Sequence, residues 1–261
     1  MLIATLVVAV WALPPIATVI LASLVAVLGA AEVATFSKQL NAPVTARFIG
    51  PIAGVICFAF AMGLVVGPGP GADMVPILML ALVIAAGVLT LAAGPPDGSV
   101  LARAAIAVMA PVYVGLPLGA IARLRVLHGP QVVAMLAVLV IVSDSAQYFV
   151  GRAVGKRRLA PLISPAKTLE GALGGVLAAA IAGAALGPLW VPGVTAVSGA
   201  LLGMLVASFG IVGDLFESLL KRGAGMKDSS SLIPGHGGVL DRIDSWLFAG
   251  PVYYMFLRYL S

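Results

Sequence analysis

The stretch VTAVSGALLGMLVASFGIVGDLFESLL, residues 194–220, decides the fold class of this chain. It is longer than the roughly 20 residues that an α-helix needs to cross a bilayer. Its first charged residue is Asp214, and Glu217 follows three positions later. The length and apolarity predict a transmembrane helix. The two acids are costly inside such a helix and are therefore functional candidates.

The rest of the chain repeats this apolar pattern. Of its 261 residues, 61% are hydrophobic and 10% are charged, whereas a soluble domain carries about 25% charged residues. Helices satisfy their own backbone hydrogen bonds in lipid, so the sequence predicts an all-α, polytopic transmembrane bundle of about eight to nine helices. The predicted spans are roughly 15–37, 48–67, 73–93, 101–122, 130–150, 169–187, 194–220 and 243–260. Residues 1–13 form either a half-span or a short ninth helix.

The basic residues predict how the chain is oriented in the membrane. Five lysines and arginines lie in 151–168 and four lie in 221–242, out of fifteen in the chain. Two predicted spans separate these loops, so both loops emerge on one side, which the positive-inside rule assigns to the cytoplasm. The loop at 38–47 has the same parity and agrees.

One further basic loop conflicts with this orientation. Arg123 and Arg125 lie in a predicted loop at 123–128, whose parity places it on the opposite side. A helix that is short or broken near Pro111 and Pro117 would resolve the conflict.

Several short patterns have ordinary explanations. Cys57 is the only cysteine, which excludes an internal disulfide and a cysteine-based metal cluster. The glycine-rich run at 67–71 follows no strand, and "GRAVGK" at 151–156 is one residue short of a P-loop, so neither predicts a nucleotide fingerprint. Glycines spaced four apart predict close helix packing. These pairs are Gly171/Gly175, Gly183/Gly187 and Gly199/Gly203.

The acidic residues are concentrated in the same half of the chain as the basic loops. Seven of the ten carboxylates fall between positions 144 and 244. On the span that carries Asp214, Ser218 and Lys221 follow on the same helical face. Asp241 and Asp244 lie three apart at the start of the last predicted span. A purely structural ion pair, for instance Asp241 with Lys221, is the alternative explanation for such charges.

Carboxylates beside clustered cations indicate a particular chemistry. Hard oxygen ligands suit magnesium, and lysines and arginines neutralise phosphate. Gly235, Gly237 and Gly238 allow backbone N–H groups to approach an anion. Together these groups favour phosphoryl or nucleotidyl transfer.

Residues 218–244 also resemble a known family signature. They read SLLKRGAGMKDSSSLIPGHGGVLDRID, and we call them the signature segment. This segment resembles the signature of the phosphatidate cytidylyltransferases, also called CDP-diacylglycerol synthases. "SDSAQYFVGRAVGK" at 143–156 and "SPAKTLEG" at 164–171 are similar to two further motifs of that family. The resemblance covers the C-terminal half, whereas the N-terminal half matches only as spans, with Glu32 at a helix end where the family often has an acid.

Four positions depart from the family pattern. Ser145, Gln147, Ala166 and Leu169 stand where threonine, alanine, lysine and tryptophan are usual. These departures leave the reaction class unchanged and bear on the lipid preference. We therefore treat residues 1–261 as a single integral-membrane domain, with N-terminal spans in 1–128 and a catalytic half in 129–261.

The resemblance implies an enzyme of phospholipid biosynthesis that converts CTP and phosphatidic acid to CDP-diacylglycerol and diphosphate. It implies Mg²⁺ with a second, monovalent cation, a homodimer, and an active site on the cytoplasmic face of the inner membrane. Contact with membrane lipids is expected, and a nucleic-acid partner is not. The implied catalytic residues are Asp214, Asp241, Lys227 and Lys221, and the implied metal ligands are Asp214, Asp241 and Asp244. The implied substrate-binding residues are Lys167, Ser164, Thr168, Arg222, Arg242, His236, Gly237, Gly238 and Asp144.

Other functions remain open at the level of sequence. A CTP-dependent polyprenol kinase or a cytidylyltransferase for ether lipids would use similar groups. An ion-coupled transporter would also place acids within spans, but it gives no reason for the signature segment. For His236, a hydrogen bond that orders the turn is the alternative to a contact with the triphosphate.

Overall fold

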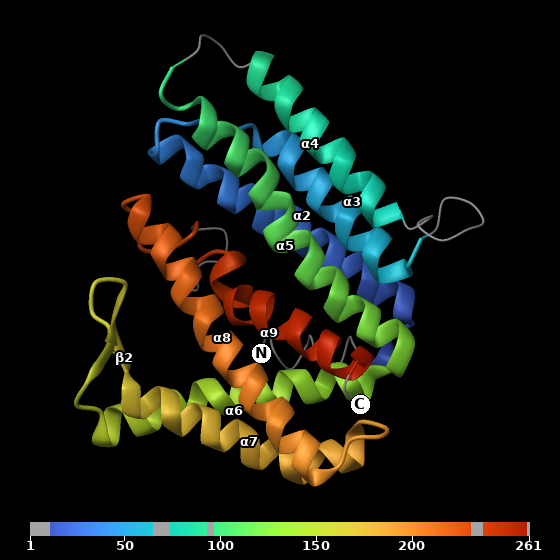
Figure 1. The fold of residues 1–261 in the computed structure, drawn as a ribbon, viewed down its shortest axis with the longest axis vertical. Coiled ribbons are helices and arrows are strands. Elements are labelled where there is room, and N and C mark those ends of the chain that lie inside the picture. Colours follow the sequence, from blue (N-terminus) through green and yellow to red (C-terminus); the bar gives the residue numbers. More distant parts are fainter. Residues whose placement is uncertain (1–10, 65–73, 93–96, 231–236, 260–261) are drawn as a thin grey trace. The chain divides into compact units, whose positions relative to one another are not determined.

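The computed structural model describes residues 11–64, 74–92, 97–230 and 237–259. Within them the chain is almost entirely helical (Figure 1). It divides into two compact units. Unit 1 comprises Met1–Pro15, Leu127–Arg222 and Ile243–Ser261. Unit 2 comprises Ile16–Val126 and Gly223–Arg242. The division falls close to the boundary expected at residue 128, except that most of the signature segment belongs with the N-terminal helices.

Unit 2 is built from four helices. They are α2 (Pro15–Gln39), α3 (Ala46–Met62), α4 (Met74–Ala92) and α5 (Val100–His128). Glycines of α3 and α5 let three of these helices approach closely. A Cβ atom at Gly54 would lie 2.7 Å from Val27 of α2, and one at Gly115 would lie 2.7 Å from the Ala53 carbonyl oxygen. The four helices run side by side in Figure 1.

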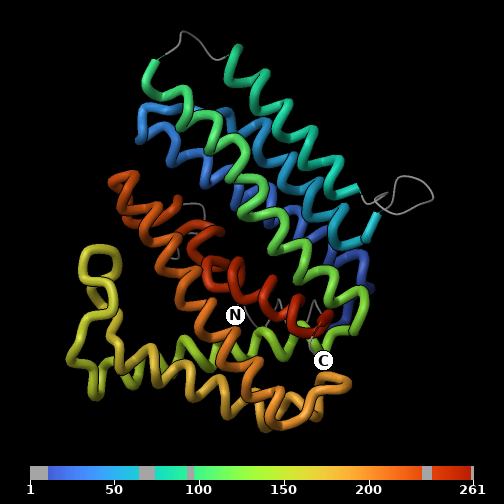
Figure 2. The backbone as a smooth tube through the Cα atoms, viewed as in Figure 1, coloured from blue at the N-terminus to red at the C-terminus, as the bar shows by residue number. Residues whose placement is uncertain are grey.

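Unit 1 combines helices with a small hairpin. Its helices are α6 (Pro130–Val154), α7 (Leu169–Trp190), α8 (Ala196–Gly223) and α9 (Leu240–Tyr259), the last two extending slightly into unit 2. Strands β1 (Arg158–Ala160) and β2 (Ser164–Thr168) pair antiparallel between α6 and α7. The yellow tube in Figure 2 shows this hairpin projecting where α6 ends and α7 begins.

The predicted membrane spans are largely confirmed. Six of the described helices, α2 and α4 to α8, are long and apolar enough to cross a membrane. Helix α3 has 17 residues, fewer than the roughly 20 predicted for a span. Helix α9 exists as predicted, but its first turns are charged. The expected helix in residues 1–13 lies mostly outside the described residues.

The predicted loop at 123–128 is wrong, because these residues form the last turns of α5. Helix α5 continues through Pro111 and Pro117 without a break, so the proposed proline interruption is wrong as well. Arg125 is buried, and Arg123 donates a hydrogen bond to the Ala61 carbonyl oxygen at 3.3 Å. Both cations therefore lie in the last turns of α5 rather than in a loop.

The predicted role of the small residues in packing is confirmed for α7 and α8. Gly183 of α7 faces the Gly199 carbonyl group of α8, and Gly203 of α8 faces the Ala179 carbonyl group. Any side chain at these positions would collide with the opposite backbone. The two helices can therefore pack closely without the help of large apolar side chains.

Candidate active site

An ion pair between a strand and a helix forms the centre of the polar site in unit 1. The Lys167 ammonium group, on β2, lies 2.5 Å from Asp214 Oδ2 on α8. The two side chains are 19% and 29% exposed, so the pair is shielded yet reachable from solvent. Ser218 Oγ donates to Asp214 Oδ1 at 3.4 Å. The predicted polar face of α8 is thus confirmed for Asp214 and Ser218.

Two further carboxylates lie within electrostatic reach of this pair. Lys167 and Asp214 act electrostatically on both Asp144 of α6 and Asp244 of α9. Gln147, one of the departures from the family pattern, donates to Asp144 Oδ1 at 3.1 Å. We call Asp144, Lys167, Asp214 and Asp244 the acid–lysine cluster. It brings together four residues that the sequence predicted separately.

The hairpin that carries Lys167 is anchored at both ends. Thr168, which is also predicted to bind substrate, caps α7 by accepting a hydrogen bond from the Gly171 N–H at 3.1 Å. The Glu170 carboxylate accepts the backbone N–H groups of Lys156 and Arg157, at 3.0 Å for Lys156. These contacts restrict the position of Lys167 before any substrate arrives. Whether Thr168 also contacts substrate stays a prediction.

The other basic residues near α8 have partners within unit 1. Lys221 lies 2.5 Å from Glu217 Oε2, and the Glu217 side chain is fully buried. This pairing differs from the proposed Asp241–Lys221 bridge. Arg222 is exposed and its Nε donates to the Ile163 carbonyl oxygen at 3.3 Å, which ties the hairpin to α8. Ser164, at the start of β2, is half-buried.

A second polar cluster lies in unit 2, around Asp241. Its Oδ2 atom accepts hydrogen bonds from the Ser229 N–H at 2.9 Å, the Ser229 hydroxyl at 2.9 Å and the Gly238 N–H at 2.8 Å. Gly237 has φ +78°, a left-handed conformation that favours glycine. Of the predicted glycine turn, Gly237 and Gly238 are described, and the Gly238 N–H donates to Asp241, whereas Gly235 lies outside the described residues.

Glu32 of α2 is the polar residue whose importance the sequence understated. Its side chain is buried, 5% exposed, and it accepts hydrogen bonds from Ser229, Ser230, Val239 and Leu240. About 200 residues of sequence separate these groups, so no local spacing could reveal the contact. The sequence offered two signals, an acid within an apolar helix and the resemblance to a family that often has an acid at this helix end.

The remaining residues that were predicted to bind substrate differ in their exposure to solvent. Lys227 and Arg242 are exposed in unit 2 and can meet a solvent-borne anion. His236 lies outside the described residues.

Within the described part of the chain, no three carboxylate, histidine or cysteine side chains are arranged to hold a metal ion together. A cation with only one or two protein carboxylates is compatible with this arrangement, and magnesium is bound in that way when it completes its shell with water and phosphate.

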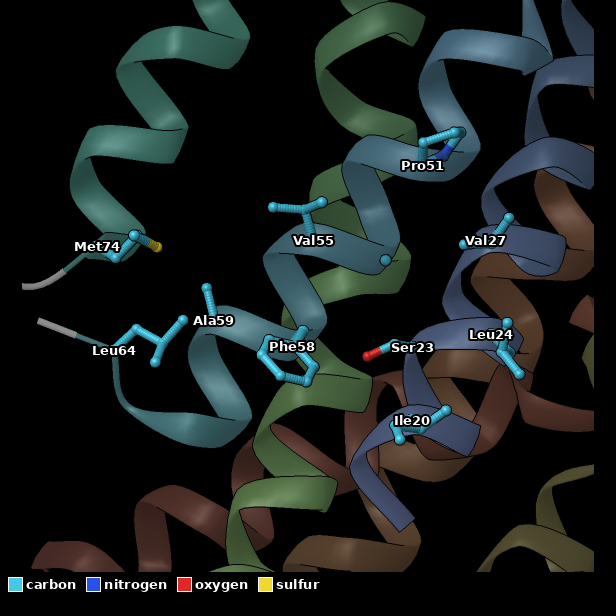
Figure 3. Close-up of a pocket in the computed structure, with 11 residues that line it drawn as sticks. Ile20, Ser23, Leu24, Val27, Pro51, Val55, Phe58, Ala59, Leu64 and Met74 are labelled. Carbon is cyan, nitrogen blue, oxygen red and sulfur yellow. The ribbon is translucent and has the colours of Figure 1, made fainter. Parts of the chain in front are cut away.

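An apolar groove in unit 2 is distinct from both polar clusters. It encloses about 350 Å³ and is lined by residues of α2 and α3 together with Leu64 and Met74 (Figure 3). Among its described lining residues, Ser23 alone carries a polar side chain, and its hydroxyl already donates to the Val19 carbonyl oxygen at 2.9 Å. The groove therefore has no group to recognise a nucleotide.

Comparison with known proteins gives a consistent result. The profile of the Cytidylyltransferase family matches residues 1–260. The phosphatidate cytidylyltransferase of Bacillus subtilis is 38% identical over 158 residues, which cover 59% of this chain and 58% of that protein. The corresponding enzyme of Pseudomonas aeruginosa is 48% identical over 122 residues, 46% of this chain and 45% of that protein. An uncharacterized protein of Escherichia coli, YnbB, is 45% identical over 131 residues, 50% of this chain and 44% of that protein.

Apolar helices of spanning length that carry an acid–lysine cluster define a multi-pass membrane protein with the polar groups of an enzyme. With the family profile matching almost every residue, the chain belongs to the cytidylyltransferase family. It spans about half the length of the curated relatives it matches.

Proposed function

We propose that this chain is a phosphatidate cytidylyltransferase that converts CTP and phosphatidic acid to CDP-diacylglycerol and diphosphate. The observation that carries the proposal is the acid–lysine cluster, held at 2.5 Å between Lys167 and Asp214 in a family of cytidylyltransferases. The names of the relatives from Bacillus subtilis and Pseudomonas aeruginosa support the same lipid substrate.

The proposed chemistry suits a site without a strong general base. A phosphate oxygen of phosphatidic acid forms a bond to the α-phosphorus of CTP, while the bond to the β-phosphate breaks and diphosphate leaves. The attacking oxygen is already an anion, so no proton has to be removed. The protein must hold two anionic substrates together and stabilise the charge of the leaving group.

We assign the lysines and arginines of the site to the neutralisation of the negative charge on the substrate phosphates. Lys167 exchanges part of its contact with Asp214 for substrate phosphate, because both groups are partly exposed. Exposed Lys227, Arg222 and Arg242 neutralise the triphosphate. Lys221 contributes positive charge near the phosphates while it remains paired with Glu217. His236, Gly237 and Gly238 complete the contacts to the nucleotide.

Magnesium fits the carboxylates of this chain. Asp214 and Asp244 belong to one cluster, and carboxylate oxygen is the ligand type that Mg²⁺ prefers. Asp241 remains a predicted ligand, although its Oδ2 atom already accepts three hydrogen bonds. Bound magnesium would supply positive charge at the phosphates. A second, monovalent cation is part of the proposal.

The decisive experiment uses CTP labelled separately at its α- and γ-phosphates. Purified protein with phosphatidic acid and Mg²⁺ should transfer the α label to lipid and release the γ label in diphosphate, one diphosphate for each lipid formed. Chelation of the metal with EDTA should abolish the reaction. Appearance of the γ label in lipid would indicate a polyprenol kinase, and no transfer would favour a transporter. Preference for an ether-linked phosphatidic acid would redirect the proposal to ether lipids.

We further propose that the protein lies in the inner membrane as a homodimer and that its active site is on the cytoplasmic face. Cysteines replacing Arg158 and Gly223 should react with a membrane-impermeant thiol reagent only from the cytoplasmic side. A cysteine replacing Pro192, between α7 and α8, should react only from the other side. Cys57 is fully buried and gives little background. Opposite sidedness of positions 158 and 223 would contradict the orientation, and a monomeric mass in mild detergent would contradict the dimer.

A further inference from the structure

The strongest unassigned feature is the way in which Glu32 meets the signature segment. Its Oε1 atom accepts the Ser230 hydroxyl at 2.6 Å and the Val239 N–H at 2.9 Å. Its Oε2 atom accepts the Ser229 hydroxyl at 2.8 Å and the Leu240 N–H at 2.8 Å. One carboxylate thus joins residues 229–230 to residues 239–240 of the same unit.

The hydrogen-bond donors of the described residues surround both oxygens of this carboxylate. An ionised carboxylate has about four lone-pair sites and donates nothing. Four donors surround Glu32, and two of them are backbone N–H groups that cannot accept a proton in exchange.

The number of hydrogen bonds that the Glu32 carboxylate accepts also indicates its role. Each of its two oxygens accepts two hydrogen bonds from described residues, so neutral donors already engage the carboxylate. The Val239 and Leu240 N–H groups belong to the start of α9, where backbone donors lack partners within the helix. A carboxylate at this end also interacts favourably with the helix dipole. Glu32 therefore caps α9 from a different helix.

The cap lies directly beside Asp241. The Ser229 hydroxyl is 2.8 Å from Glu32 Oε2 and 2.9 Å from Asp241 Oδ2, so its single proton serves both carboxylates. Gly238 lies against the same groups, because a Cβ atom there would be 2.6 Å from Glu32 Oε2. Displacing Glu32 would remove one acceptor of the Ser229 hydroxyl and would thereby disturb the hydrogen bonds that hold Asp241.

We propose that Glu32 is a positioning residue, which caps α9 and joins the two sides of the signature segment so that Asp241 is held in place for the reaction. The part of the inference that concerns catalysis rests on the proposed function. The part that concerns the cap does not.

The test compares Glu32→Gln with Glu32→Asp and with Thr35→Val in the full-length protein. Glutamine is nearly isosteric, but either orientation of its amide turns an NH₂ group toward the Val239 or Leu240 N–H. Aspartate keeps the acceptors on a shorter side chain. Thr35→Val is the matched control, since it removes a hydrogen bond of the same helix, to the Glu32 carbonyl oxygen, without touching the carboxylate.

Two readouts separate the inference from the proposed function. Hydrogen exchange at the Val239 and Leu240 amides should accelerate at least about tenfold in Glu32→Gln, less in Glu32→Asp, and not in Thr35→Val. CDP-lipid formation should lose kcat more than it changes KM for CTP, with partial rescue by aspartate. Unchanged exchange in Glu32→Gln overturns the inference, whatever the activity. Absence of CDP-lipid formation by the wild type overturns the proposed function, and the exchange data still decide the cap.

A milder variant covers the case in which Glu32→Gln does not fold. Ser230→Ala removes one of the four donors and leaves the carboxylate intact. It should accelerate exchange at Val239, whose N–H shares Oε1, more than at Leu240. Equal acceleration throughout α9 would indicate general destabilisation and would contradict the cap.

Discussion

Asp214→Asn should lower the rate of CDP-lipid formation at least about a hundredfold, the scale on which one well-placed electrostatic contact acts in catalysis. Asparagine keeps the shape of the side chain, so α8 and its packing should survive. The substitution removes the charge that Lys167 meets at 2.5 Å, and the lysine is only 19% exposed. A shielded lysine without its partner will seek other anions, which disturbs both its position and the affinity of the cluster for magnesium.

The measurement is the initial rate with purified protein, together with thermal unfolding to verify folding. Asp97→Asn is the matched control because it too removes one carboxylate from an ion pair, here with Arg103 at 3.4 Å in the turn before α5. There the Ser99 hydroxyl and N–H donate to Asp97 and lower the pKa of its carboxyl group. We expect near-normal activity in Asp97→Asn. A folded Asp214→Asn protein with more than a tenth of the wild-type rate would refute the role assigned to Asp214.

Gly238→Ala should reduce activity about a hundredfold, because displacement of a catalytic group by about 1 Å can have an effect of this size. The new Cβ atom would overlap the Ser229 hydroxyl and would lie 2.6 Å from Glu32 Oε2. Ser229 would have to leave its position between Glu32 and Asp241. We also expect a loss of about 1–3 kcal/mol in the free energy of unfolding, the usual cost of overpacking.

Gly223→Ala is the control for this substitution. A Cβ atom at Gly223 meets nothing within 4 Å, and the residue ends α8, so alanine should be neutral or slightly stabilising there. Activity and unfolding are measured for both variants under the same conditions. Equal activity of the two alanine variants would show that the close contacts around Gly238 are unimportant for the reaction.

Much of the fold could be predicted because membrane-spanning length is a local property. The run that contains Asp214 was apolar over more than one bilayer thickness, and it forms α8. The predicted span at 101–122 is confirmed as α5, but the break suggested near Pro111 and Pro117 is wrong, because the helix continues through both prolines. The hairpin at 158–168 was not anticipated, since the pairing of Arg158 with Thr168 depends on contacts across a turn.

The candidate site was predictable in part for a similar reason. Asp214 and Ser218 share a helical face, which the spacing alone indicates. The ion pair of Lys221 with Glu217, one turn away on the same helix, was not named from the sequence, which gave Asp241 only as an example of an alternative partner. The residue types of the signature segment indicated the chemistry, but not which carboxylate each donor would meet.

The sequence by itself determined the membrane-spanning helices, the class of chemistry and the family, because these depend on apolar length and on a continuous motif. Only the tertiary structure decided that Lys167 lies against Asp214 and that Glu32 holds the start of α9. These contacts join residues far apart in the chain, and no local spacing specifies them. The physical reason is that a buried carboxylate requires donors from wherever the fold brings them, and for Glu32 the fold brings them from residues 229–240.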